Sequence, residues 1–160
     1  MANFKDLGDF QYRQGTRKFT RTRKSLKKFS FDVSNATDIT DSFDASKDCV
    51  LVIKPLNEHA FLRPEYLVIQ LSDISAGTDA ITIRITTDTA GDIVFFPDTQ
   101  ATISDAISGG GVGTVAYSLQ LPFVDTTDSA TSFYLFAKTD ASGEDVNITS
   151  ADLYCTVETY

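Results

Sequence analysis

Several residue types are scarce in this sequence, and each scarcity removes a class of function. The chain has no tryptophan, one methionine, one histidine and two cysteines among its 160 residues. The single histidine, His59, leaves no second imidazole for a metal site, and no serine stands in the nucleophile-elbow context of a hydrolase. We therefore expect a protein that is not an enzyme, and we predict no cofactor and no metal ligands.

The sequence also lacks the segments that direct a chain into or across a membrane. It contains no run of roughly 18 consecutive apolar residues, so no transmembrane helix is expected. Its first residues, Met-Ala-Asn-Phe-Lys-Asp, lack the apolar core of a secretory signal, which favours a protein kept in the cytoplasm of the cell that makes it. Cys49 and Cys155 lie in alternating apolar runs, which favours two buried free thiols over a disulfide bond.

After residue 30 the sequence is a succession of β-strands separated by short turns. The predicted strands are rich in Val, Ile, Thr, Tyr and Phe and cover residues 49–55, 65–72, 80–88, 92–98, 112–123, 131–140 and 146–160. Several alternate as one buried face requires; Ile81, Ile83 and Ile85, for example, fall on one side of their strand. About eight strands without a long helix predict an all-β protein, an antiparallel β-sandwich of either jelly-roll or immunoglobulin-like topology.

The connections between these strands carry recognisable turn residues. Residues 87–92 and 139–145 each combine Thr-Asp, small residues and a glycine, which predicts two hairpin loops. The stretch 98–113 offers one short helical turn around residues 103–107. The glycine-rich loop that follows leads into a strand, so it lacks the helix N-terminus of a phosphate-binding loop.

Two loops gather carboxylates. Residues 38–48 contain Asp38, Asp41, Asp44 and Asp48, and residues 124–130 contain Asp125 and Asp128. Oxygen ligands of this kind suit calcium, but the spacing of an EF-hand loop is absent. We interpret both loops as solvated surface, with a Ca²⁺ site as the alternative.

The distribution of charge divides the chain into two parts. Residues 1–30, here called the basic arm, hold nine Lys or Arg and two Asp, a net charge of +7. Residues 31–160 hold five basic and 20 acidic residues, a net charge of −15. Such asymmetry indicates an arm that meets an acidic partner. We predict two units, the basic arm at 1–30 and a β-sandwich domain at 31–160.

Aromatic and aliphatic side chains are interleaved with the cations of the basic arm. The mixture suits an ordered strap that buries aromatic rings against an acidic protein surface, and it also allows stacking on single-stranded bases. Helical spacing relates Arg17, Arg21, Lys24 and Lys28, but the alternation over residues 16–24 favours an extended arm. The residues predicted to bind the partner are Arg13, Arg17, Lys18, Phe19, Arg21, Arg23, Lys24, Lys27, Lys28, Phe29 and Phe31.

A family resemblance adds to this picture. The stretches 84–104 and 131–160, preceded by a basic and partly aromatic arm, resemble small β-sandwich virion proteins of tailed bacteriophages, in particular capsid decoration (cement) proteins. The likeness covers most of residues 30–160 and lies in the order of the parts, a basic arm followed by a small acidic β-rich body. It implies a structural protein of the outer capsid surface, made in the host cytoplasm and bound to the major capsid protein.

The same resemblance implies how such a protein would act. It implies a homo-oligomer, with a trimer favoured, whose arms clamp neighbouring capsid subunits. About 30 extended residues reach up to roughly 100 Å, which is long enough to bridge two capsomers.

Two other functions fit the same layout. One is a small-virus coat protein, a jelly roll whose basic arm neutralises packaged genome, and in this case nucleic acid would be bound through the arm alone. The other is a head-fibre or tail module that binds a receptor or glycan, with Tyr12, Tyr117, Tyr134 or Tyr154 stacking on sugars. Against genome binding, a charge of +7 on each arm is modest and the acidic body would repel nucleic acid.

Overall fold

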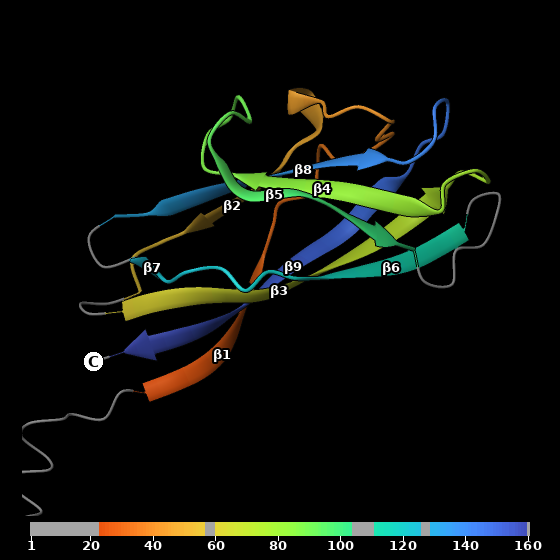
Figure 1. The fold of residues 1–160 in the computed structure, drawn as a ribbon. Helices are drawn as coiled ribbons and strands as arrows, with labels where there is room; N and C mark the ends of the chain where they lie inside the picture. The colour runs from red at the N-terminus through yellow and green to blue at the C-terminus, as the bar shows by residue number, and fades with distance from the viewer. Residues whose placement is uncertain (1–22, 57–59, 104–110, 126–128, 160) are drawn as a thin grey trace, which may run out of the picture.

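The fold is that of a computed structural model, which describes residues 23–56, 60–103, 111–125 and 129–159 (Figure 1). Only the backbone is described for Arg23 and Thr159. The elements of the described residues are β1 (Arg23–Ser30), the 3-10 helix η1 (Ala45–Lys47), β2 (Cys49–Ile53), β3 (Ala60–Ile74), β4 (Ala80–Thr86), β5 (Val94–Thr102), β6 (Gly111–Ser118), β7 (Val124–Asp125), β8 (Thr131–Thr139) and β9 (Asn147–Thr159).

The strands form two antiparallel sheets that face each other as a sandwich (Figure 1). The five-stranded sheet has the order β1-β9-β3-β6, with β7 paired to β3, and the four-stranded sheet has the order β2-β8-β4-β5. Apart from β7, consecutive strands cross from one sheet to the other at every connection but the β4–β5 hairpin. This is the strand order of a jelly roll. The predicted antiparallel β-sandwich is therefore confirmed, and of the two topologies the chain has the jelly roll.

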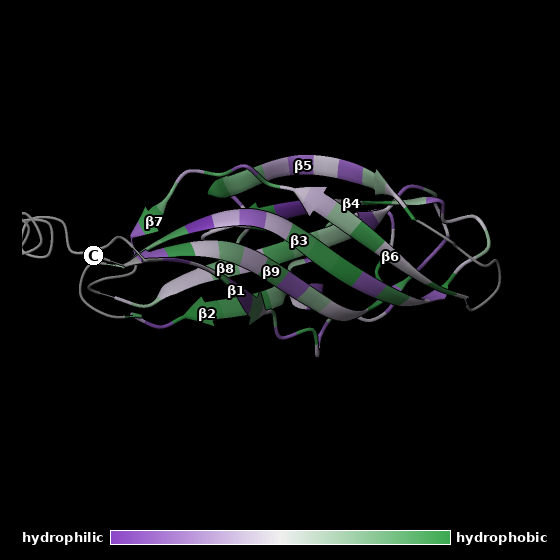
Figure 2. Cartoon of the chain, turned by 90° about the horizontal axis from the view of Figure 1, so that it is seen from below, coloured by the Kyte–Doolittle hydropathy of each residue, from purple (hydrophilic) through white to green (hydrophobic). Residues whose placement is uncertain are grey.

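The core lies between the sheets and is filled by the alternating apolar residues of the strands. Ile81, Ile83 and Ile85 of β4 are buried, as their alternation predicted. In β9, Leu153, Cys155 and Val157 are buried in the same way. Figure 2 shows the corresponding alternation of polar and apolar bands along β3 and β9. One face of β4 and of β9 thus loses its contact with water, and burial of this kind is the main contribution to stability in a sandwich of this size.

Several predicted strands have different bounds in the structure, among them the one predicted at 92–98, which is β5 at Val94–Thr102, and two of the differences have a clear cause. The strand expected at 65–72 begins at Ala60 instead, because Pro64 is accommodated where the pairing with β9 shifts register between Pro64 and Tyr66. A bulge tolerates a residue that has no N–H to donate to the ladder. The strand expected at 112–123 ends at Ser118, since the chain then takes a positive φ of 45° at Gln120.

One of the two predicted hairpins is confirmed and the other is wrong. Residues 87–92 turn between the paired strands β4 and β5, where Gly91 has φ 82° and the Asp88 carboxylate accepts the backbone N–H groups of Asp92 and Ile93. Residues 139–145 also contain a glycine with positive φ, Gly143. However, they connect β8 and β9, which lie in different sheets. The turn residues are similar in both loops, but they do not determine whether the next strand pairs with the preceding strand or crosses to the other sheet.

Other sequence predictions concern the cysteines and two short segments. Cys49 and Cys155 are free and buried, as predicted. The helical turn expected at 103–107 lies mostly outside the described residues, and so does His59. Among the residues that are described, no helix is long and apolar enough to cross a membrane.

The buried face of β4 offers a test of where the stability resides. Replacing Ile83 by alanine should lower the free energy of unfolding by roughly 2–5 kcal/mol, because the side chain is fully buried between the sheets. The matched control is Val52→Thr on β2, where the side chain is 53% exposed. This change should stay within about 0.5 kcal/mol. Urea unfolding followed by tyrosine fluorescence measures both, and equal losses would contradict the assignment of the core.

Candidate protein-binding surface

Part of the basic arm is a strand of the sandwich. Residues 23–30 form β1, which pairs in antiparallel register with β9 over eight residues, from Arg23 opposite Thr159 to Ser30 opposite Asp152. Residues opposite each other in such a pair project from the same face of the sheet. Lys24, Leu26 and Lys28 therefore share a face with Glu158, Thr156 and Tyr154, and this is the outer face of the five-stranded sheet.

The lysines of β1 are exposed, and only one of them has a carboxylate partner among the described residues. Lys24 donates to Glu158 at 2.9 Å, and the Lys24 side chain is 67% exposed. Lys27 and Lys28 are exposed and form no ion pair within the part of the chain that the structure describes. Leu26, 57% exposed, lies between them and Lys24. The edge of the sheet is thus basic, with one aliphatic side chain in its middle.

Phe29 and Phe31, which were predicted to anchor a partner, are used within the chain itself. Phe31 is buried in the core, and its backbone N–H donates to the Ala151 carbonyl at 2.9 Å. Phe29 is half-buried and packs against the core. Both residues attach the arm to the body, so a partner meets the lysines and Leu26 and not these rings. The remaining predicted residues, Arg13, Arg17, Lys18, Phe19 and Arg21, lie outside the described residues, as does the Arg23 side chain.

Aromatic residues continue this surface across the outer face of the five-stranded sheet. Tyr66 and Tyr154 stack with ring centroids 4.7 Å apart, and Lys28 is opposite Tyr154 in the register. Farther along, the Arg63 guanidinium lies 4.7 Å from the centre of the Phe123 ring. Offset stacks and cation–π contacts of this kind hold side chains in fixed positions on an exposed face. Of these residues only Lys28 and Tyr154 were predicted from the sequence, because the pairing with β9 joins residues that are far apart in the chain.

The tyrosines predicted to stack on sugars differ in burial and contacts. Tyr117 is buried and its hydroxyl donates to the Ile81 carbonyl at 2.7 Å, so it cannot stack on a ligand. Burial also raises the pKa of this phenol. Tyr134 is half-buried, Tyr154 is covered on one face by Tyr66, and Tyr12 lies outside the described residues. No platform of several open rings is formed by the tyrosines that are described.

The acidic loop 38–48 packs on the outer face of the four-stranded sheet. The Phe43 ring lies 4.6 Å from the Arg84 guanidinium and 5.0 Å from the Lys138 ammonium group. Arg84 also donates twice to Asp98, at 2.6 and 3.0 Å, which lowers the pKa of that carboxyl. Asp44 caps η1 by accepting from the Ser46 N–H and hydroxyl. The described residues contain no group of three or more side chains that could hold a metal ion.

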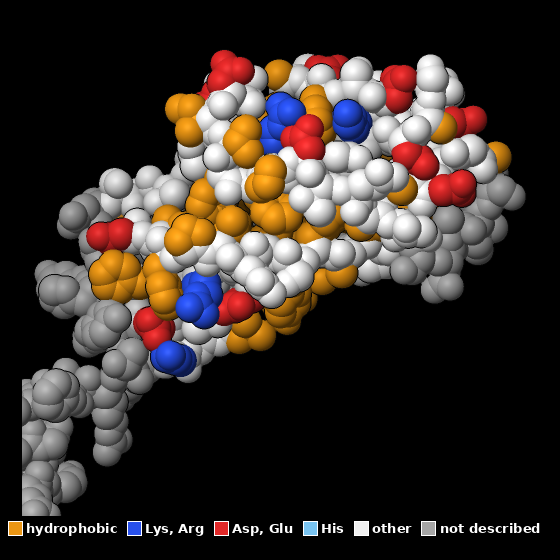
Figure 3. All heavy atoms as spheres, viewed as in Figure 1, with side chains coloured by type: hydrophobic (Ala, Val, Ile, Leu, Met, Phe, Trp, Pro, Cys, Tyr) orange, Lys and Arg blue, Asp and Glu red, His pale blue; other side chains and the backbone are white. Residues whose placement is uncertain are grey.

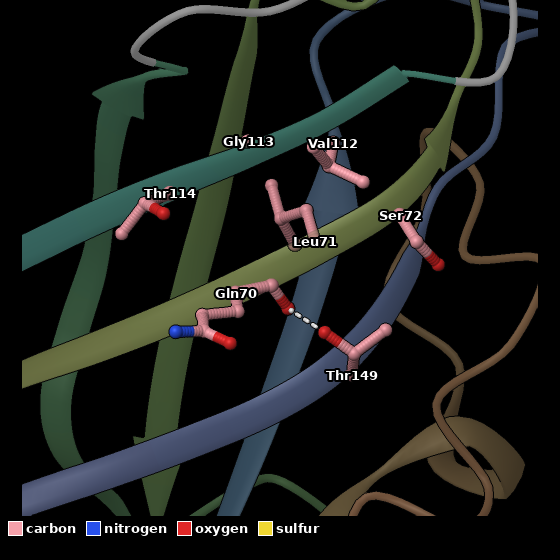
Figure 4. A pocket seen from close by; sticks show the side chains of 7 residues that line it. All are labelled: Gln70, Leu71, Ser72, Val112, Gly113, Thr114 and Thr149. Atoms are coloured by element: carbon pink, nitrogen blue, oxygen red, sulfur yellow. Dashed lines mark hydrogen bonds between the residues drawn. The ribbon is translucent and has the colours of Figure 1, made fainter.

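A shallow hollow lies on the outer face of the five-stranded sheet, away from β1 (Figure 4). It measures about 380 Å³ and lies over β3 and β6 where Gly113 is opposite Leu71. Gln70, Ser72, Thr114, Thr149 and Val112 complete its lining, and the Thr149 hydroxyl donates to the Gln70 carbonyl at 3.2 Å. None of these side chains ionises, so the hollow offers no group for acid–base catalysis.

Neither cysteine is placed to act as a nucleophile. Burial raises the pKa of the Cys49 thiol and of the Cys155 thiol to about 12. The thiolate is the reactive form, so both thiols stay protonated and inert at neutral pH. The described surface therefore contains groups for binding, and its cysteines contribute to packing.

Comparison with known proteins adds no family to this description. No protein-family model matches the chain, and no curated protein matches it. Among solved structures, a galactanase from Phanerochaete chrysosporium matches with 8% identity and a TM-score of 0.39, over 83% of this chain and 27% of its own. The dimeric latent PorU from Porphyromonas gingivalis matches with 11% identity and a TM-score of 0.42, over 88% and 13%.

A third match is the Eiger TNF from S. frugiperda, with 10% identity and a TM-score of 0.35 over 84% of this chain and 92% of that one. The chain spans about a quarter or less of the first two proteins, at 27% and 13% of their lengths. Likenesses of this size carry no argument about function. Evidence about function therefore comes from the surface of the molecule.

The state of the thiols can be checked directly. In the folded protein at pH 8, neither Cys49 nor Cys155 should react with a chromogenic disulfide reagent within minutes, because both are fully buried. After unfolding in guanidinium chloride, two thiols per chain should react, since both are free. Rapid reaction of either thiol in the folded state would show that one of them is accessible.

Proposed function

We propose that this chain is a non-enzymatic structural protein of a virion, a capsid decoration protein whose basic arm binds acidic surfaces of neighbouring capsid subunits. The observation that carries the proposal is the continuity of the arm with β1. The cations of residues 1–22, here called the distal arm, lead directly into a strand whose lysines are exposed and which is followed at once by Phe31, buried in the core. Such a segment combines a binding surface with a firm attachment.

The pairing of β1 suits it to carry tension. Eight residues of β1 are held by β9, and β9 is in turn paired with β3 along most of its length. Inter-strand hydrogen bonds run perpendicular to antiparallel strands. A pull along the arm therefore loads the whole ladder together instead of opening it one bond at a time. A strap between capsid subunits needs this kind of attachment, and many such copies strengthen one another through their effective concentration.

The charges favour a protein partner over nucleic acid. The body beyond residue 30 carries −15, and on β9 the Glu158 carboxylate lies beside Lys24 and that of Asp152 beside Ser30, at the two ends of β1. A long polyanion laid along this face would be repelled by the body, whereas a limited acidic patch on a protein can meet the arm alone. The interleaved aromatic residues of the distal arm would add the buried anchors on which protein interfaces depend.

A coat protein that binds packaged genome through the same arm is the second candidate. The jelly-roll strand order favours it, because viral capsid domains are among the proteins that share this architecture. Fold alone does not assign function, since lectin domains and cupins share it too. The two candidates differ in what the arm touches, and they can be separated by experiment.

Removing residues 1–22 should abolish co-sedimentation with DNA-free capsids and leave the fold intact, because β1 and its pairing with β9 remain. Retention of capsid binding by the truncated chain would exclude the strap. If the full chain instead binds single-stranded nucleic acid, with an affinity that falls steeply as salt is raised, the genome-binding candidate takes its place.

The exposed lysines of β1 allow a matched test within the folded body. Lys28→Glu should weaken capsid binding about tenfold, since it turns an attractive charge into a repulsive one on the outer face of the five-stranded sheet. Lys54→Glu makes the same change at another exposed lysine, just beyond β2, and should leave binding unchanged. Titration of capsids with fluorescently labelled protein measures both. Equal effects would mean that net charge, and not the β1 surface, governs binding.

A further inference from the structure

An exposed apolar strip runs along the edge of the sandwich opposite β1. It consists of Ile93, Val94 and Phe95 at the start of β5, and of Leu121 and Phe123 between β6 and β7, and we call it the apolar seam. Ile93 is 63% exposed, Val94 49% and Phe123 42%. Three of the seven large hydrophobic residues exposed in the described part of the chain thus belong to it. Contiguous exposed apolar surface of this kind marks a contact site more often than chance.

The two halves of the apolar seam belong to different sheets at the same edge of the sandwich, with the Phe123 ring beside Arg63 on the outer face of the five-stranded sheet. In Figure 1 the start of β5 lies above the chain that joins β6 to β7, and in Figure 2, seen from below, the two overlap. Figure 3 shows hydrophobic side chains gathered between the sheets on this side of the molecule. Phe95 and Leu121 are half-buried against the core, and the Phe95 ring lies 5.0 Å from that of Phe133. The seam is therefore an extension of the core that reaches the surface.

Carboxylates lie at one end of the apolar seam. Asp88 and Asp92 belong to the β4–β5 hairpin, immediately before Ile93 and Val94. Asp88 accepts the Ile93 N–H at 2.7 Å and the Asp92 N–H at 3.2 Å, and these hydrogen bonds favour its ionised form. No lysine or arginine occurs in residues 85–99, but Arg84, just before them, is bound to Asp98 and also interacts with Asp92. A segment that fits this site should carry both apolar rings and cations.

We propose that the apolar seam receives the distal arm of a second copy of this chain. The distal arm contains four aromatic residues, Phe4, Phe10, Tyr12 and Phe19, and five cations. Its composition complements an apolar strip that ends in carboxylates. The inference rests on the proposed role of the arm as a protein-binding strap, and it names one of the surfaces that the arm binds.

The length of the distal arm permits exchange between copies. The distal arm joins β1 at Arg23, and β1 and β6 are opposite ends of the order β1-β9-β3-β6. At about 4.8 Å per strand, the arm begins roughly 15 Å from the β6 edge of its own sheet. It begins, moreover, at the outer end of β1, where the strand leaves the sandwich (Figure 1). An extended run of 22 residues reaches up to about 70 Å, which suffices to cross to a neighbour.

Exchange of this type also closes on itself. Reciprocal exchange between two copies gives a two-fold dimer, and exchange in one direction gives a closed ring when the rotation between copies completes a circle. Each seam would then be covered once. The arrangement would leave the lysines of β1 on the outside of the oligomer, free for a further partner.

The first experiment measures the mass of the purified protein by sedimentation equilibrium, with no capsid present. The intact chain should form oligomers, and removal of residues 1–22 should leave monomers. Ile93→Lys removes an apolar contact and repels the arm, so it should raise the dissociation constant roughly tenfold or more. Val52→Lys places the same charge at an exposed valine on β2, at the opposite edge of the sandwich, and should have no effect. A monomeric intact chain, or equal effects of the two lysine variants, would overturn the proposal.

The second experiment shows which copy supplies the arm. Chains carrying Phe19→Cys are mixed with chains carrying Ile93→Cys and treated with a short bismaleimide; the native thiols are buried and should not react. A covalent dimer in the mixture is the expected result. Cross-linking only within a chain that carries both substitutions would overturn the proposal and show that each arm folds back.

These outcomes separate the inference from the proposed function. A protein that is monomeric by itself but binds DNA-free capsids through its arm would support the decoration function and contradict the exchange of arms. An arm-dependent oligomer that does not bind capsids would support the exchange of arms and contradict the decoration function.

Discussion

The antiparallel ladder between β1 and β9 is the interaction on which the rest of this structure depends. It joins the two parts of the chain that differ most, a basic arm and an acidic sandwich. β9 is paired on both edges, with β1 on one side and β3 on the other, and its inward side chains Leu153, Cys155 and Val157 belong to the core. Whatever the arm binds is therefore attached to a strand that is held on both edges and packed in the core.

The same ladder explains why an edge strand can be basic without destabilising the fold. Edge strands expose unpaired backbone groups, and lysines on them prevent unwanted pairing with other chains. In β1 this protection and the proposed binding surface are the same residues. One cation, Lys24, is paired with Glu158, which is 8% exposed, while Lys27 and Lys28 remain available. Local charge thus limits sheet-to-sheet aggregation and leaves a surface for a chosen acidic partner.

Much of the fold followed from short-range patterns, and the failures have physical causes. The alternation of Ile81, Ile83 and Ile85 located β4 and its buried face, because one residue of slip would expose all three. Strand order could not be predicted in this way, since it depends on contacts between residues distant in sequence. The loop at 139–145 illustrates this, because its turn residues resemble those at 87–92 but its strands lie in different sheets.

The candidate surface was predictable only in part. Lysines 24, 27 and 28 were named from composition, and they are exposed. Phe31 was misplaced as a partner anchor because an aromatic residue beside cations has the same sequence pattern whether it meets a partner or its own core. The stack of Tyr66 on Tyr154 and the apolar seam were not predictable, since each is assembled from strands that only the fold brings together.

A reconstruction of the assembled particle at a resolution that traces the main chain would test the central claim most directly. The account predicts that density continues from Arg23 outward over a neighbouring protein subunit, with the sandwich on the outer surface of the shell. Density that leads from Arg23 into the packaged nucleic acid, with the sandwiches forming the shell itself, would contradict it.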